Sequence, residues 1–311
     1  MINLKKILNK IKCIKCACEK KEDEDIESHN NHLIKITNTP TFDQLIQFYM
    51  DNIKNSFPVE FIHKDEFFEK GRIVYEKIGI ENYIKEIKIM NNLQHEGCMK
   101  IDLRNNKLQI IISISSSKLG IGSGGGVKTF SDHQCEDFAD VLAHELFHSE
   151  IRVRIVKELG LGGFGLIHNS EKKWSQIAWR AFDEYYACRK NAEEFGSFKV
   201  AESVKSVKKI EEKLCELKKI SQKKNEMNYV PEEHINDLLY SLATISAFAD
   251  VSKEKEEVLL KEMDKLKNIF QEVKGTFNGV YQEMNLNVEK FDEIGCKLQQ
   301  IYNVHILDKY I

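Results

Sequence analysis

The sequence predicts an α+β protein in which a small mixed sheet packs on one long helix, followed by a mainly helical C-terminal region. Residues 99–116 have the pattern of a β-hairpin, with two arms around an Asn-Asn turn, of which the second is apolar and β-branched. Ser131 can form a capping box with Gln134 and so begin a helix. Apolar residues three and four apart recur through residues 199–303, as in packed helices.

The elements follow in chain order. Residues 109–115, the second arm of the hairpin, are apolar and β-branched, so we expect a largely buried strand. Residues 120–126 are rich in glycine and predict a flexible loop, but they lack the Gly-Lys-Ser/Thr ending of a phosphate-binding loop. The helix from Ser131 should end near residue 158, at the glycines that begin with Gly160. A second helix is expected over residues 171–195.

Three regions differ in composition: a basic and charged tail at 1–30, a mixed core at 31–198 and a helical C-terminal region at 199–311. The apolar stripes of the last region are more typical of a helical core than of a partner-binding surface. They consist of Val200, Val204, Val207, Ile210, Leu214, Leu217, Ile235, Leu238, Leu242, Ile245, Leu259, Met263, Leu266 and Phe270.

Composition excludes several classes of protein. An apolar share of 42% is too high for a wholly disordered chain, and a net charge of −3 does not indicate nucleic-acid binding. Most of the eight cysteines are scattered, which suits a reducing compartment. We see no apolar run long enough to span a bilayer and no secretory signal, so we expect a cytoplasmic protein. Export by a dedicated system is an alternative.

The N-terminal tail carries three cysteines behind a short basic amphipathic segment. Residues 1–18 could contact a membrane surface peripherally, helped by acylation. A small metal site that includes His29 and His32 is an alternative, and a mobile solvated tail is the interpretation that composition favours.

Residues 144–148 read His-Glu-Leu-Phe-His inside the long predicted helix. Side chains four apart lie on one helix face, about 40° of rotation apart, so His144 and His148 can direct both imidazoles at one cation. Glu145 is displaced around the helix and can reach a water molecule instead. Burying three titratable residues in this apolar stretch would be unfavourable without a partner such as a metal. A structural histidine pair on a half-exposed helix is the alternative.

A catalytic zinc needs a third protein ligand and one open position. Residues after His148 do not continue the pattern that would supply a third histidine. We predict Glu184 instead, because it falls on the apolar face of the second helix. Asp183 and His168 are alternative third ligands, and a solvated salt bridge from Arg180 is the competing interpretation of Glu184. One Zn²⁺ per chain is expected.

These residues resemble the zincin metallopeptidases, specifically the gluzincin type, in which a glutamate from a later helix joins the two histidines. Short intracellular members have a Glu-x-x-Ala after the HExxH helix, and Glu184-Tyr-Tyr-Ala187 has this pattern. The resemblance covers residues 107–195 and implies a metallopeptidase core within 31–198. It implies that His144, His148 and Glu184 bind zinc and that Glu145 is the base.

The resemblance also implies that the strand at 109–115 lines the cleft, where an extended peptide could pair with its edge. The expected reaction is hydrolysis of a peptide or protein substrate by a zinc-activated water, with Glu145 moving the proton. Tyr185 and His168 are the first candidates to stabilise the oxyanion, and Tyr186 and Arg189 are others.

Two other interpretations stay open. The chain could be a non-catalytic, metal-stabilised interaction protein whose helical C-terminal region binds a partner. It could also be a di-iron carboxylate protein, since Glu145-x-x-His148 and Glu60-x-x-His63 have the ligand spacing of that class.

Overall fold

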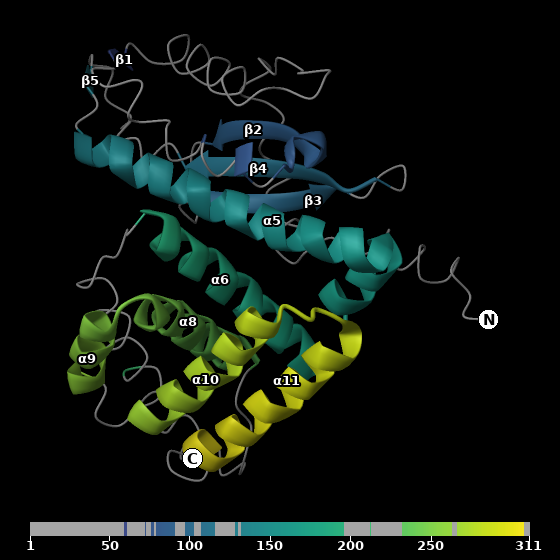
Figure 1. The fold of residues 1–311 in the computed structure, drawn as a ribbon, viewed down its shortest axis with the longest axis vertical. Coiled ribbons are helices and arrows are strands. Elements are labelled where there is room, and N and C mark those ends of the chain that lie inside the picture. Colours follow the sequence, from purple (N-terminus) through teal and green to yellow (C-terminus); the bar gives the residue numbers. More distant parts are fainter. Residues whose placement is uncertain are drawn as a thin grey trace. The chain divides into compact units, whose positions relative to one another are not determined.

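The computed structural model describes about half of the chain, all of it within one compact unit, Pro40–Ile311 (Figure 1). This part is mostly helical and contains a small three-stranded mixed sheet, as expected from the sequence. The ranges described are 59–60, 72, 76–77, 79–90, 97–102, 107–115, 128–129, 132–195, 212, 232–262 and 266–307. The predictions for residues 1–30 and for the glycine-rich loop at 120–126 fall outside these ranges.

The sheet has the strand order β2-β4-β3. Strands β3 (Gly97–Asp102) and β4 (Gln109–Ser115) pair antiparallel, which confirms the predicted hairpin, and β2 (Ile84–Met90) joins β4 in parallel. Ile110, Ile112 and Ile114 of β4 are fully buried, as expected for the central strand of the sheet. The expectation that a peptide adds to the edge of β4 is therefore wrong, since both of its edges are already paired. The outer strands of the described sheet are β2 and β3.

Smaller elements surround the sheet. A 3₁₀ turn, η1 (Glu81–Tyr83), leads directly into β2. Strands β1 (Val59–Glu60) and β5 (Lys128–Thr129) form a separate short parallel ladder.

Helix α5 (Asp132–His168) is longer than predicted. Gly160 is non-helical, with φ 71° and ψ 174°, and interrupts the helix near the predicted end. The chain then continues in helical conformation through the following glycines to His168. Phe164 and Ile167 in this extension are 0% and 2% exposed, and burying two such side chains outweighs a glycine penalty of about 1 kcal/mol each.

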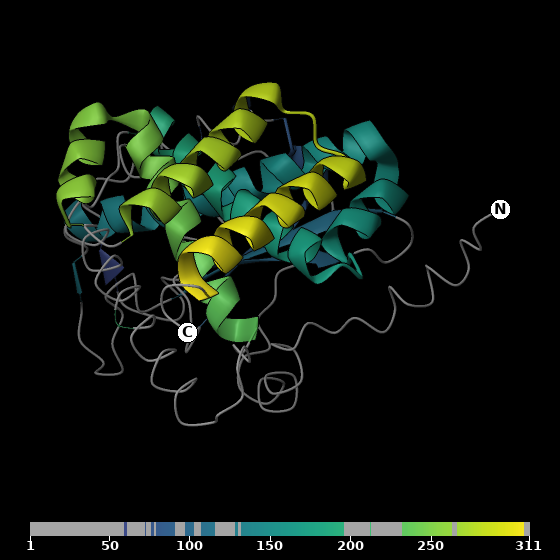
Figure 2. The same cartoon turned by 90° about the horizontal axis from the view of Figure 1, so that it is seen from below.

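The remaining helices are α6 (Lys173–Phe195), α8 (Glu232–Val251), α9 (Lys253–Glu262), α10 (Lys267–Glu283) and α11 (Val288–Tyr302), with a π-helical end at Asn303–Leu307. Helix α6 packs against α5, α8 and α11, and α10 packs against α8 (Figure 2). The described C-terminal stripe residues are buried, as predicted. They belong to the same hydrophobic core as α5 and α6.

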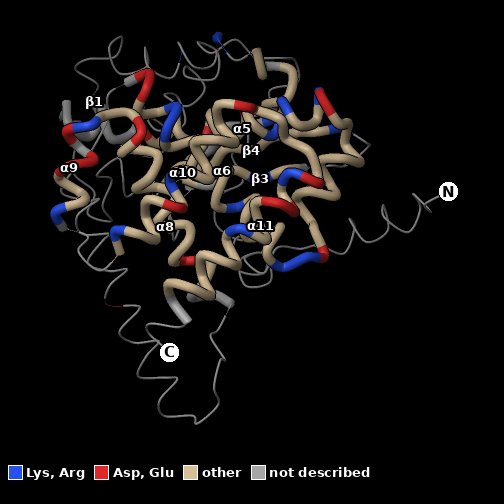
Figure 3. Tube along the Cα trace, turned by 60° about the horizontal axis from the view of Figure 1, so that its bottom comes forward, with Lys and Arg blue, Asp and Glu red and all other residues tan. Residues whose placement is uncertain are grey.

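The sheet packs on α5 through β3 and β4, as predicted, and α5 also packs against α6. Acidic and basic residues are interspersed along the described helices (Figure 3). The unusual charges are the buried ones on α5 and α6: Glu145, Asp183, Glu184 and Arg189 are each less than 9% exposed. Among the described residues, no helix combines the length and apolar character needed to cross a bilayer.

Candidate metal centre

Helices α5 and α6 bring His144, His148 and Glu184 together. The Nε2 atoms of the two histidines lie 3.0 Å apart. Oε1 of Glu184 is 3.7 Å from His144 Nε2, and its Oε2 is 3.3 Å from His148 Nε2. The sequence-predicted triad thus converges, although the histidines and the glutamate come from different helices.

The spacing of these atoms fits a small divalent cation. Around a tetrahedral zinc with bonds of about 2.0–2.1 Å, neighbouring donor atoms lie about 3.3 Å apart. The three separations, 3.0, 3.3 and 3.7 Å, bracket that value. Two imidazole nitrogens and a carboxylate oxygen are also the donor types that zinc accepts. Both imidazole nitrogens and the carboxylate of Glu184 are therefore close enough to share one small cation.

The second nitrogen of His148 strengthens this interpretation. Nδ1 of His148 is 3.2 Å from Asp183 Oδ1, close enough for an ion pair, although the two atoms are not aligned as a hydrogen bond. We assign the proton of the neutral ring to Nδ1, which faces this carboxylate, so that Nε2 presents a lone pair to His144 and Glu184. Three electron-rich atoms facing one another need a cation between them, either a proton or a metal.

The charges around His148 also favour a cation at this point. Burial alone would lower its pKa, but Asp183 and Glu184 outweigh burial and raise the pKa of His148 to about 10. Arg152 donates to Asp183 Oδ2 over 2.5 Å. Burial would raise the pKa of Asp183, yet Arg152 and His148 lower it to about 2. Asp183 is thus a permanent carboxylate behind His148, on the side away from the Nε2 donors, and it orients the ring instead of serving as third ligand.

Glu184 is held at both carboxylate oxygens. The thiol of Cys188 donates to Oε1 over 3.2 Å, and the hydroxyl of Tyr240 donates to Oε2 over 2.5 Å. Burial would raise the pKa of Glu184, but His144 and His148 bring it well below its usual range. The predicted alternative, a solvated salt bridge from Arg180, is wrong because Glu184 is 5% exposed and its oxygens face these buried groups.

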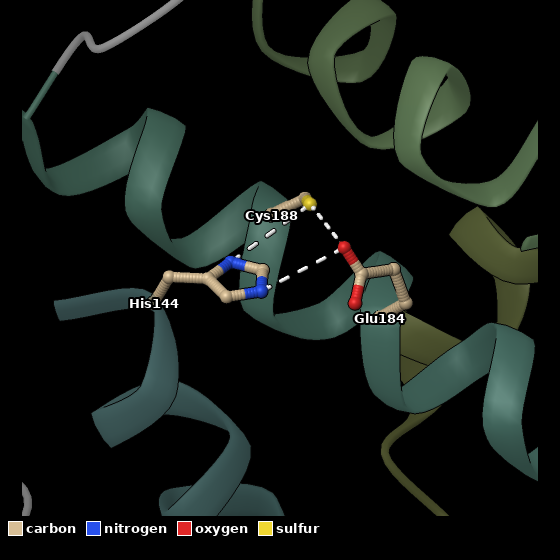
Figure 4. Close-up of side chains that lie close together, drawn as sticks. All are labelled: His144, Glu184 and Cys188. Atoms are coloured by element: carbon tan, nitrogen blue, oxygen red, sulfur yellow. Dashed lines mark hydrogen bonds and ion pairs between the residues drawn. The ribbon is translucent and has the colours of Figure 1, made fainter. Parts of the chain in front are cut away.

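Cys188 and Tyr240 were not predicted as site residues. Figure 4 shows His144 of α5 directed at Glu184 and Cys188 of α6, and these three side chains offer donor atoms within 4.8 Å of one another. Cys188 lies four residues after Glu184, so helical spacing alone could have identified it. Tyr240 comes from α8, 56 residues downstream of Glu184, and no local pattern connects the two.

Glu145 lies on the sheet side of the site. A Cβ atom at Gly97 of β3 would come within 2.6 Å of Glu145 Oε1 and 2.9 Å of its Cγ. Glu145 is 7% exposed. Burial and Glu184 raise its pKa, and the two histidines partly oppose this. A carboxyl group with a raised pKa beside two imidazoles suits general base and acid chemistry.

The structure does not bring Tyr185 or His168 to this cluster. Tyr185 is one residue past Glu184, roughly 100° around the helix, and its hydroxyl bonds to Asp250 and to Arg189. His168 accepts a 3.2 Å hydrogen bond from Trp179 Nε1 and stacks on Phe164. The contacts of neither residue support a role in binding an oxyanion.

The other two oxyanion candidates also form hydrogen bonds with groups outside the metal cluster. Tyr186 shares a hydrogen bond with Glu150, and Arg189 bonds to Tyr185 and Asn278. The di-iron interpretation loses its second ligand pair, because Glu60 lies in strand β1 and not in a helix, while His63 is outside the described ranges.

Comparisons with known protein families, with curated proteins and with solved structures found no match to this chain.

Proposed function

We propose that this chain is a zinc-dependent metallopeptidase that binds one Zn²⁺ through His144, His148 and Glu184 and hydrolyses peptide bonds with Glu145 as general base. The observation that carries the proposal is the convergence of two imidazole nitrogens and the carboxylate of Glu184 from two packed helices, with nitrogen–nitrogen and nitrogen–oxygen distances of 3.0 to 3.7 Å. Three protein ligands leave one coordination position open, which is typical of catalytic zinc sites.

Each protein residue has a definite task in this proposal. When bound, zinc would polarise the scissile carbonyl and lower the pKa of a water molecule in the open position. Glu145 takes the proton of that water and passes it to the leaving amine, for which its raised pKa is suited. Asp183, fixed by Arg152, keeps His148 in the tautomer whose Nε2 faces the metal.

The substrate class follows from the neighbouring strand. Within the described sheet, β3 is paired on one side only, and it carries Gly97 against Glu145. An extended peptide pairing with the other side of β3 would bring its main chain past the general base without meeting a side chain at Gly97. A peptide or protein substrate is therefore favoured over a compact small molecule.

Glu145→Gln is the direct test. Hydrolysis of a quenched fluorescent peptide library should fall by about 10²- to 10⁴-fold, the usual contribution of a general base, while zinc content stays at one per chain. Glu158→Gln, an exposed glutamate on the same helix paired with Arg154, is the matched control and should hydrolyse as the wild type does. Full activity of Glu145→Gln would overturn the proposal.

One observation favours a second candidate, a non-catalytic zinc site. If Cys188 became a fourth ligand beside His144 and Glu184, the coordination would close and the metal would be structural. The Co²⁺-substituted chain separates the two cases, because a cysteine ligand produces a thiolate-to-cobalt charge-transfer band. The peptidase proposal predicts that this band is absent and that Cys188→Ala binds zinc.

A further inference from the structure

The carboxylate of Glu184 receives its strongest hydrogen bond from outside the helix that carries it. Tyr240 OH lies 2.5 Å from Oε2, whereas the Cys188 thiol, a weaker donor, lies 3.2 Å from Oε1. A carboxylate oxygen can only accept, so the Tyr240 hydroxyl is the donor of this bond.

Packing does not explain why a tyrosine occupies position 240. Its neighbours on α8 are Leu238, Leu239 and Leu242, and each of them is 1% exposed or less. Tyr240, in contrast, is 48% exposed as a residue. The ring therefore adds little to the core, while its hydroxyl reaches a buried carboxylate. The hydroxyl and its hydrogen bond, and not the packing of the ring, therefore explain why a tyrosine occupies this position.

We infer that Tyr240 is a positioning residue of the metal centre: it holds Oε2 of Glu184, fixes the plane of the carboxylate and leaves Oε1 to bind the metal. This inference rests on the metal site of the proposed function. A carboxylate free to rotate would bind through either oxygen or both, and a donor on one oxygen selects a single mode. The bond also makes α8 part of the centre, so the site is complete only when the C-terminal helices are docked on α6.

Tyr240→Phe in the full-length chain tests this inference, because it removes the hydroxyl and keeps the half-exposed ring. Competition with a chromogenic chelator should show Zn²⁺ affinity reduced by about 10- to 100-fold, the usual effect of losing a partner of a metal ligand. The visible spectrum of the Co²⁺-substituted variant should also change, as the carboxylate changes its binding mode. Circular dichroism of the metal-free variant should show wild-type helical content, although its melting temperature should fall because a buried carboxylate oxygen loses its donor.

Tyr281→Phe is the matched control, since its hydroxyl donates to Glu193 at the surface, away from the centre. It should bind Zn²⁺ with wild-type affinity. If Tyr240→Phe binds Zn²⁺ as tightly as the wild type and has the same Co²⁺ spectrum, the role of Tyr240 is overturned while the peptidase proposal stands. If the wild-type chain itself binds no Zn²⁺, both are overturned.

Discussion

Helix α6 carries two buried polar clusters on different faces, and they differ in how their charges are balanced. The cluster around Tyr185, Arg189 and Asp250 is self-sufficient: Arg189 bonds to the Tyr185 hydroxyl and to Asn278 Oδ1 over 2.7 Å each, and Lys274 lies 3.4 Å from Asp250. In the cluster around Glu184, donor atoms face one another instead, and the guanidinium of Arg152 is bound to the neighbouring Asp183.

This difference separates a structural network from a candidate site. Buried polar groups in a stable core are paired with one another. Where nitrogen and oxygen lone pairs converge, as around Glu184, the arrangement favours a shared cation, either a proton or a metal. Residues 184 and 185 are adjacent in sequence, yet only the side chain of Glu184 points into such a convergence. The predictions below test the contrast from the largest expected effect to the smallest.

Arg189→Met should have the largest effect on stability. It leaves the buried Asp250 with Lys274 as its remaining cation, and breaking a buried pair on one side costs about 3–5 kcal/mol. Urea denaturation of the metal-free chain measures this loss. Zinc content per folded chain should not change, because Arg189 has no part in the metal cluster; a variant that loses zinc while folded would contradict the separation of the two clusters.

Glu184→Ala should have the opposite effects: the chain should lose zinc but keep its folded structure. Structural zinc sites with four protein ligands bind the metal with roughly 10–16 kcal/mol, or about 3 kcal/mol for each ligand, so losing Glu184 should reduce zinc affinity by more than about 100-fold. The variant should therefore lose zinc on dialysis against a chelator and retain its helical circular dichroism. Retained metal, measured by elemental analysis, would require a different third ligand.

His168 shows that a buried histidine near these clusters need not belong to either. Burial, followed by the positive charge of Arg152, lowers its pKa to about 4, so it stays neutral. Between the unfolded pKa near 6.5 and this value, the unfolded chain binds more protons, and stability falls as the pH falls through that window. The residue is partly exposed, so we expect a loss of about 2 kcal/mol by pH 4.

Denaturation of the metal-free chain at several pH values measures this contribution. His168→Gln cannot titrate but can still accept from Trp179. The difference in unfolding free energy between wild type and variant should change by about 2 kcal/mol between pH 7 and pH 4. A difference that is constant with pH would mean that His168 binds protons equally well in the folded and the unfolded chain.

The parts of the site that could be predicted from the sequence are those that local geometry determines. His144 and His148 are one helical turn apart, and Glu184 shares a face with buried residues of its own helix, so periodicity was sufficient. Tyr240 depends on how α8 docks, and nothing in its own segment indicates that contact. The central position of β4 likewise depends on β2 arriving in parallel from earlier in the chain, which a hairpin pattern does not reveal.

Two glycines test the difference between the Glu184 cluster and the Arg189 cluster with the smallest change, one added methyl group. Gly97 of β3 has no room for a methyl group, because Glu145 and Val141 already occupy that space at 2.6 to 2.9 Å. Gly279 of α10, the helix that supplies Asn278 to the Arg189 cluster, has nothing within 4 Å of an added Cβ. Alanine should therefore displace the proposed general base at the first position and fit without displacement at the second.

Gly97→Ala should reduce turnover per zinc-loaded chain by about 10-fold, since Glu145 can rotate only part of the way back to its position. Its zinc content should be unchanged, because the displaced side chain is not a ligand. Gly279→Ala should keep full turnover and gain about 0.5–1 kcal/mol in unfolding free energy, the difference between alanine and glycine inside a helix. Equal turnover in the two variants would mean that the close approach of β3 to Glu145 has no role in the reaction, and the strand would lose its place in the proposed substrate site.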